Sequence, residues 1–319
     1  MKYGLALAFL ITVQTIALAS DKERQDAREL LEKAEAAADI LQLTAFELKA
    51  SVKLENQGKP IAGSYLFLWK GSDQWREEVA LPSYTQVTVG AKGVVFQKRS
   101  TDFLPLQISQ LQGLMSYGRR LLPGPKETIL RVHGHKINGI KVDCVEIADP
   151  EHNSREICVD LSTNALVRES PFVDRDLAAV GSKLFPRSLT YVEHGKSIVL
   201  AEVTELKTTD AFPSSAFDPP PGALSKPGCI NPDRGWVDRK VPPIYPPQER
   251  MAHREGTVSV YAVIGSDGTL HDLRIVSGAS PALDRSTLDA MLQWRYEPYT
   301  CNGVPVEVES ILVTNYRLQ

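Results

Sequence analysis

The spacing of apolar residues along the first hundred positions predicts one helix followed by a run of strands. An apolar stripe among charged residues predicts an exposed helix over residues 22–42. The stripe consists of Leu30, Leu31, Ala34, Ala38 and Leu41. Strand-like segments follow, separated by glycine, proline or asparagine turns, at 45–55, 61–70, 74–80, 84–90 and 93–99.

A second series of elements extends to residue 207. Near-helical spacing predicts an amphipathic helix over 104–122, from Leu104, Ile108, Leu111, Met115 and Leu122. Asn138-Gly139 between two isoleucines predicts a tight hairpin. A short helix is expected near 174–183, and further strands at 128–136, 140–147, 154–160, 164–170, 185–193 and 197–207. About ten antiparallel strands in one region predict a strongly curved sheet.

One of the predicted strands is apolar on both of its faces. Tyr65, Phe67 and Trp69 would point to one face, and Leu66 and Leu68 to the other. An antiparallel strand with one wet face should instead alternate between apolar and polar residues. Something must therefore cover each face of this strand, and the predicted helix 104–122 is one candidate.

A different pattern begins near residue 242. Residues 256–264 alternate cleanly, a turn follows at 265–268, and 270–277 form a second strand. A helix then begins with a serine cap and a proline in its first turn. Its buried face carries Leu283, Thr287, Met291 and Trp294. With a last strand over 304–318, the order is strand, strand, helix, strand.

The proline distribution predicts where the two regions meet. The chain has 21 prolines in 319 residues, and ten of them fall between Pro213 and Pro247. Residues that break helices and strands concentrate at a boundary rather than inside one core. We therefore expect an α+β protein with a curled antiparallel domain at 20–222, a proline-rich linker at 223–241 and a small ββαβ domain at 242–319.

Charge and motifs exclude several functions. With 36 Lys+Arg against 39 Asp+Glu and a net charge of −3, there is no electrostatic reason to expect nucleic-acid binding. The motifs of serine hydrolases and zinc proteases are absent, so we expect neither an enzyme nor a cofactor. Gly195-Lys196-Ser197 predicts a hairpin turn rather than a phosphate loop, because Thr190 stands where the first glycine of such a loop should be. His133 and His135 share a strand face, but no third ligand is near, so no metal site is expected.

Residues 1–19 have the features of a secretory signal. Lys2 precedes an apolar stretch, and Ala17-Leu18-Ala19 is a small-x-small cleavage site before Ser20. The stretch is shorter than the roughly 20 residues that a membrane span needs. We expect a cleaved chain located in the periplasm, with an uncleaved membrane anchor as the open alternative.

Export would allow the four cysteines to form disulfides. Cys144 and Cys158 flank a turn symmetrically about Glu151, so in a simple hairpin they would lie directly opposite each other. Cys229 and Cys301 are then left to pair, which would tie the linker to the second domain. Free buried thiols remain the alternative.

Residues 22–222 resemble the LolA-type lipoprotein-carrier superfamily. The resemblance rests on a leading helix, a long curled sheet, inserted helices and the ending Phe212-Pro213-Ser214-Ser215-Ala216-Phe217-Asp218-Pro219-Pro220-Pro221-Gly222. It implies a half-barrel with an apolar concave face that holds a lipid or lipoprotein. The implied ligand residues are Tyr65, Phe67, Trp69, Leu111 and Met115. An ordinary sheet core is the alternative.

Residues 242–319 closely resemble the C-terminal domain of TonB. The matching motifs occur in order with the family's spacing: Pro243-Ile244-Tyr245-Pro246, Glu255-Gly256, Asp267-Gly268, Ser277-Gly278, Leu283-Asp284, Trp294-Arg295-Tyr296-Glu297-Pro298 and Gly303-Val304-Pro305-Val306. The resemblance implies TonB-type transport, in which a peptide segment of an outer-membrane or other envelope protein is captured by strand addition. The implied partner-binding residues are Tyr245, Pro246, Arg295, Tyr296, Val313, Asn315 and Tyr316.

The chain departs from the TonB pattern in ways that favour binding over force transmission. Its N-terminal stretch has no histidine, whereas TonB's membrane anchor carries one. Its linker of about 20 residues is far shorter than a TonB arm. The glutamine that precedes Pro-x-Tyr-Pro in TonB is Pro242 here. We therefore do not expect the inner-membrane motor complex as a partner, and a lipid or lipoprotein carrier or sensor is the alternative function.

Overall fold

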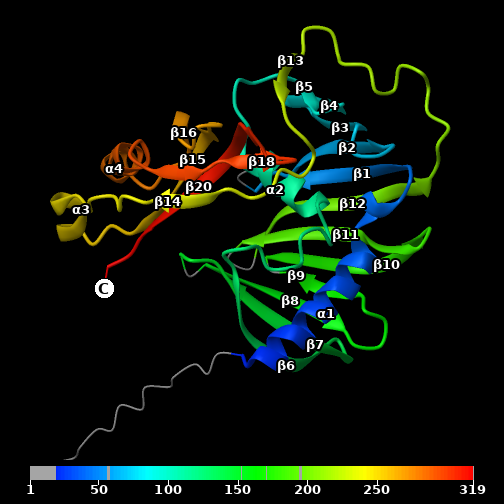
Figure 1. Cartoon of the computed structure of the whole chain (residues 1–319). Helices are drawn as coiled ribbons and strands as arrows, with labels where there is room; N and C mark the ends of the chain where they lie inside the picture. The colour runs from blue at the N-terminus through cyan, green and yellow to red at the C-terminus, as the bar shows by residue number, and fades with distance from the viewer. Residues whose placement is uncertain (1–18, 56–57, 152, 170, 194–195, 319) are drawn as a thin grey trace, which may run out of the picture.

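The computed structural model describes residues 19–55, 58–151, 153–169, 171–193 and 196–318 (Figure 1). The predicted signal segment lies outside these residues, apart from Ala19. Among the described residues, no helix is both long enough and apolar enough to cross a membrane. The protein is a mixed α+β chain in which curled, unclosed antiparallel sheets predominate, as the strand pattern predicts.

A nine-stranded antiparallel sheet makes up most of the N-terminal region. Its strands, in spatial order, are β10 (Phe172–Val180), β11 (Lys183–Glu193), β12 (Lys196–Thr208), β1 (Phe46–Leu54), β2 (Ile61–Trp69), β3 (Gln74–Leu81), β4 (Tyr84–Ala91), β5 (Val94–Arg99) and β13 (Leu224–Pro227). Strand β1 pairs directly with β12, so the earliest strand of this sheet along the chain lies beside a strand that ends at Thr208.

The second sheet has four strands and shares a helix with the first. Its order is β6 (Thr128–Ile137), β7 (Ile140–Ala148), β8 (Ser154–Asp160) and β9 (Leu166–Glu169). Helix α1 (Asp21–Ala38) contacts strands of both sheets through its buried face (Figure 1). Helix α2 (Leu106–Met115) packs against β11 and β12. The predicted Asn138-Gly139 hairpin is confirmed, and both residues have positive φ.

The two-sided apolar strand is covered on both faces, as expected. Tyr65, Phe67 and Trp69 are buried on the face that meets the core, and Leu68 is buried on the other face. Leu68 lies opposite Arg76 on β3, and the Arg76 guanidinium donates to the carbonyls of Ala216 and Asp218. The segment after β12 is thereby held over the outer face of the sheet.

Three expectations about the N-terminal region were wrong in detail. The expected helix near 174–183 is strand β10, because pairing with β11 outweighs the local pattern around the charged residues 174–176. Asp176 has a positive φ of 58°, and the register with β11 is the same on either side of it. The expected helix 104–122 ends at Met115, and Gly118 then adopts a left-handed φ of 70°. The expected helix 22–42 divides into α1 and a 3-10 turn, Ile40–Gln42.

The C-terminal region has the expected ββαβ order. Its sheet, in the order β16-β15-β20, consists of β16 (Leu270–Ser277), β15 (Gly256–Ile264) and β20 (Val308–Tyr316). Helix α4 (Pro281–Met291) begins where the Ser280 side chain accepts a hydrogen bond from the Leu283 amide. Trp294 and Leu283 fill the core beneath it. The expected last strand, 304–318, is split into β19 (Val304–Val306) and β20.

Short elements connect the two regions, and the first two of them lie in residues 223–241, which we call the connector. Residues 224–227 form β13, which extends the nine-stranded sheet, and β14 (Trp236–Arg239) pairs with β17 (Arg295–Glu297). The remaining short elements are α3 (Pro247–Met251) and β18 (Tyr299–Cys301), which pairs with β19. Both predicted disulfides are confirmed: Cys144–Cys158 joins directly paired residues of β7 and β8, and Cys229–Cys301 ties the connector to the C-terminal region.

A nearly buried ion pair joins β5 to β20. The Arg99 guanidinium donates to both carboxylate oxygens of Glu309, at 2.8 and 2.5 Å, and the Tyr261 hydroxyl donates to the same carboxylate at 2.6 Å. Tyr261 also meets the ring of Phe103 edge to face. The C-terminal sheet is therefore docked on the N-terminal region through both charge and aromatic packing.

The close approach at Gly268 gives a test of the C-terminal fold. A Cβ there would lie 1.9 Å from the carbonyl oxygen of Tyr296, whereas Gly93 has a similar φ of 77° and open space around it. We expect Gly268→Ala to lower the free energy of unfolding by about 3 kcal/mol or more. Gly93→Ala should cost only the left-handed backbone strain, about 1 kcal/mol. Urea denaturation of both variants compares them, and equal midpoints would refute the close approach.

Candidate functional site

Strand β20 forms one edge of the C-terminal sheet. It pairs with β15 along its whole length, from Gly256 opposite Tyr316 to Ile264 opposite Val308. No other strand in the described part of the chain pairs with its second edge. An unpaired edge presents backbone N–H and C=O groups that a further strand can use.

A groove of about 330 Å³ runs along β20, and we call it the edge groove. Four consecutive residues of the strand, 310–313, line it. Successive side chains of a strand point to opposite faces, so a groove that contacts four in a row lies along the strand's edge. The opposite wall comes from the loop between β7 and β8 and from the connector, while Trp294, Tyr296 and Tyr299 line its base.

Two of the seven predicted partner-binding residues line the edge groove. Val313 is half-exposed on β20, and Tyr296 is half-buried on β17. Asn315 lies farther along β20, where its side chain accepts a hydrogen bond from Thr257. The structure therefore brings Val313 and Tyr296 together and leaves Asn315 outside the groove lining.

The other four predicted residues have structural contacts elsewhere. Tyr245 and Tyr316 meet edge to face with ring centroids 5.3 Å apart, and the Tyr316 hydroxyl is buried beside Thr287 at 2.9 Å. Pro246 precedes α3 as its cap. The Arg295 guanidinium donates to the backbone carbonyl of Trp294 at 2.7 Å. These contacts stabilise the domain.

Sequence reasoning missed the second wall of the edge groove. Asp149 and Glu151 come from the β7–β8 loop, and Arg234 and Lys240 from the connector. They lie more than 60 positions before β20 in the sequence. No local motif links such distant segments, and only the docking of the two regions brings them together.

A second cavity, of about 310 Å³, lies between the nine-stranded sheet and the C-terminal region, and we call it the concave cavity. Three of the five predicted ligand residues line it: Tyr65, Phe67 and Met115. Trp69 lines a neighbouring cavity instead, and Leu111 is fully buried in the core. The connector, over residues 226–232, and the start of β20 close the concave cavity.

Polar groups face the concave cavity alongside its apolar wall. The Glu77 carboxylate accepts hydrogen bonds from the Tyr65 hydroxyl at 2.8 Å and from the Gln112 amide at 2.7 Å. Burial raises the pKa of Glu77 above 4.5, although these hydrogen bonds and the charge of Arg119 lower it. The Arg119 guanidinium lies over the ring of Phe67 at 5.7 Å. Its Nε is buried without a hydrogen-bond partner among the described residues.

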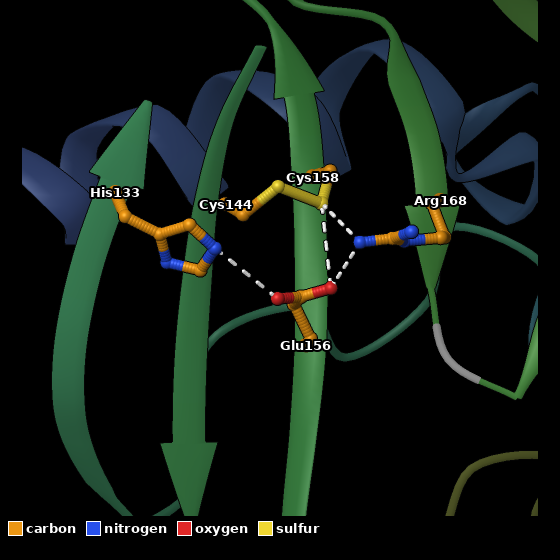
Figure 2. The surroundings of a disulfide bond; sticks show 5 residues. All are labelled: His133, Cys144, Glu156, Cys158 and Arg168. Atoms are coloured by element: carbon orange, nitrogen blue, oxygen red, sulfur yellow. Dashed lines mark hydrogen bonds and ion pairs between the residues drawn. A yellow bond between two sulfur atoms is a disulfide. The ribbon is translucent and has the colours of Figure 1, made fainter. Parts of the chain in front are cut away.

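A cluster of ligand-type side chains surrounds the Cys144–Cys158 disulfide on the sheet face away from α1 (Figure 2). Ligand atoms of His133, Cys144 and Glu156 lie within 4.8 Å of one another. The Cys144 sulfur is bonded to Cys158, so it is not a thiolate that could bind a metal. Glu156 instead pairs with His133 at 3.3 Å and with the guanidinium of Arg168. The cluster covers a disulfide.

Comparison with known proteins supports the assignment of the C-terminal region. Residues 241–318 match the family described as Gram-negative bacterial TonB protein C-terminal. Protein TonB of Pseudomonas aeruginosa is 36% identical over 66 residues, which are 20% of this chain and 19% of that protein. Protein TonB of Vibrio cholerae is 28% identical over 113 residues, 35% of this chain and 46% of that protein. The chain therefore matches less than half the length of either curated relative.

The N-terminal region has its own likeness among solved structures. A LolA superfamily protein from Nitrosomonas europaea is similar to 60% of this chain over 96% of its own length, with 12% identity and a TM-score of 0.41.

The raised pKa of Glu77 predicts how stability depends on pH. The folded state holds the Glu77 proton more tightly than the unfolded state, so this carboxyl stabilises the fold at low pH. As the pH rises above about 4.5, that contribution is lost. We expect Glu77→Gln to become progressively more stable than the wild type across this range, measured by urea unfolding at several pH values.

A neighbouring residue provides the control for this prediction. Glu78 points to the opposite face of β3 and pairs with Arg76 at 2.5 Å. Glu78→Gln removes a carboxylate from the same strand that does not line the concave cavity, so it is the matched control for the effect of removing a carboxylate from β3. If the free-energy difference between the wild type and Glu77→Gln does not change with pH, the carboxylate is not held in the environment described above.

Proposed function

We propose that this protein acts in the periplasm and that its C-terminal region captures an extended peptide segment of an outer-membrane or other envelope protein, as part of TonB-type transport. The observation that carries this proposal is the unpaired edge of β20 beside the edge groove. An incoming strand would gain main-chain hydrogen bonds from the edge and side-chain contacts from the groove. The match of residues 241–318 to the TonB C-terminal family supports it.

The geometry of the connector favours binding over force transmission. The connector is held at its start by β13, near its middle by the Cys229–Cys301 disulfide and at its end by β14. A force-transmitting arm must extend freely across a distance. We therefore propose domain-level binding without the inner-membrane motor complex. The two disulfides are in keeping with an oxidising compartment such as the periplasm.

Strand addition can be tested on the whole chain. We expect peptides from the periplasmic N-termini of outer-membrane receptors to change the NMR shifts of the amides of residues 308–316, in protein purified from the periplasmic fraction. Val313→Glu should weaken binding about fivefold or more, because a charge replaces an apolar contact at the edge. Leu292→Glu is the matched control, since Leu292 is 56% exposed, Val313 is 49% exposed, and only Val313 lines the groove. The absence of any β20 shifts would refute strand addition.

The concave cavity supports a second candidate, a lipid or lipoprotein carrier or sensor. The observation that favours it is the meeting of three predicted ligand residues, Tyr65, Phe67 and Met115, at the concave cavity. An apolar chain there would contact aromatic rings and the methionine side chain, and a polar head would meet Arg119. The two candidate functions use different sites and are compatible.

Native mass spectrometry can test the carrier candidate. We expect the chain purified from the periplasm to carry a lipid whose mass is released on denaturation. Met115→Trp should fill the cavity and reduce lipid occupancy by about tenfold or more. Met251→Trp is the control, because Met251 is exposed and far from the cavity lining. A wild-type chain with no co-purifying lipid would refute the candidate.

A further inference from the structure

We propose that the N-terminal region and the connector form a selective second wall of the edge groove, and that this wall favours extended segments carrying an acidic side chain. The inference rests on the proposed strand addition to β20. It adds that the C-terminal region does not choose its partner alone. A free-standing binding module would form its whole site from its own residues, whereas here both regions line one groove.

The wall begins with Asp149, Glu151 and Asn153, which hydrogen bonds tie to one another. The Asp149 carboxylate accepts hydrogen bonds from the backbone amides of Glu151 and Asn153, at 2.9 and 3.0 Å. It also accepts one from the side-chain amide of Asn153 at 3.0 Å. These bonds pre-organise the β7–β8 loop beside the groove, so that little conformational freedom is lost when a segment binds.

Ion pairs attach this wall to the connector and to the C-terminal region. The Lys240 ammonium pairs with Glu151, and the Arg234 guanidinium pairs with Glu127 at 2.9 Å. Nearby, Lys126 pairs with Glu297 of β17 at 2.5 Å. The contacts join residues distant in sequence and tie the second wall to β17, the strand that carries Tyr296.

The wall's charged side chains pair as Lys240 with Glu151 and Arg234 with Asp149, and in each pair the basic side chain is the more exposed. The side chains of Arg234 and Lys240 are 47% and 44% exposed, whereas those of Asp149 and Glu151 are 10% and 29% exposed. The two basic groups also lie over aromatic rings, Arg234 over Trp236 at 4.5 Å and Lys240 over Trp294. A ring face orients a cation without neutralising it. A segment in the groove would therefore meet cations more readily than carboxylates.

Tyr296 adds a hydrogen-bond donor at the base of the groove. Its hydroxyl has no hydrogen-bond partner among the described residues, while its backbone amide donates to the Gly268 carbonyl. Burial and then the charge of Glu151 raise the pKa of Tyr296, so the hydroxyl keeps its proton. A protonated hydroxyl that lines the same groove as Lys240 and Arg234 suits a carboxylate acceptor.

The same charges argue against other occupants. A basic segment would face Arg234 and Lys240 at close range, and like charges disfavour association. A second copy of this chain, paired edge to edge through β20, would bring two such sets of cations together. The occupant that the groove favours is an extended acidic segment of another protein.

The test compares charge variants of one peptide on the full chain. The probes are extended peptides of identical length that differ only in one central residue, glutamate, glutamine or lysine. We expect the glutamate peptide to bind wild-type protein most tightly by fluorescence anisotropy. Lys240→Glu should weaken its binding about fivefold to tenfold, because an attraction becomes a repulsion, and should improve binding of the lysine peptide. The matched control is Lys49→Glu, since Lys49 is 46% exposed, pairs with acidic residues and lies on β1.

The outcomes separate this inference from the proposed function. If the peptides shift the amides of β20 but bind wild type and Lys240→Glu with equal affinity, strand addition stands and the selective wall is refuted. If Lys49→Glu has the same effect as Lys240→Glu, the dependence reflects net charge and the wall is again refuted. If no peptide shifts β20, strand addition fails and this inference fails with it. Dimerisation through β20, detected by light scattering, would refute the acidic segment as the occupant of the edge and show that a second copy of the chain binds there.

Discussion

The Arg99–Glu309 ion pair is the contact on which the two candidate sites depend. Burial would raise the pKa of Glu309, but hydrogen bonds from Arg99 and Tyr261 outweigh it and hold the pKa below 4.5. Losing either charged partner would leave the other nearly buried and unpaired, which is strongly unfavourable. The pair places β20 against the nine-stranded sheet, and the Cys229–Cys301 disulfide restrains the same junction.

Strand β20 serves both candidate sites because of this docking. Val308 and Glu309, at its start, help to close the concave cavity, and Ser310 to Val313 border the edge groove. Any movement of β20 relative to the N-terminal region would therefore change both sites together. The cavity is formed by two regions, and so is the groove, so neither site belongs to one domain.

Several features could be predicted from sequence because they depend on local chemistry. Asn138-Gly139 predicts a hairpin since both residues tolerate positive φ, and the structure shows it. The symmetry of Cys144 and Cys158 about Glu151 predicts their pairing, since antiparallel register follows from a short turn. The failures occurred where pairing outweighs local pattern. Residues 172–180 carry three consecutive charged residues and no clean alternation, yet they pair with β11 and become a strand.

The sequence by itself determined the elements of this protein: the strand run, the ββαβ order after residue 242, both disulfides and the likeness of the C-terminal region to TonB. These features follow from periodicity, turn residues and spacing along the chain. Only the tertiary structure decided which residues share a site. It buried Tyr316 in the core with Tyr245 packed against it, left Val313 on an open edge, and brought Glu151 and Lys240 to that edge. The physical reason is that docking joins segments far apart in sequence, through contacts that no local pattern encodes.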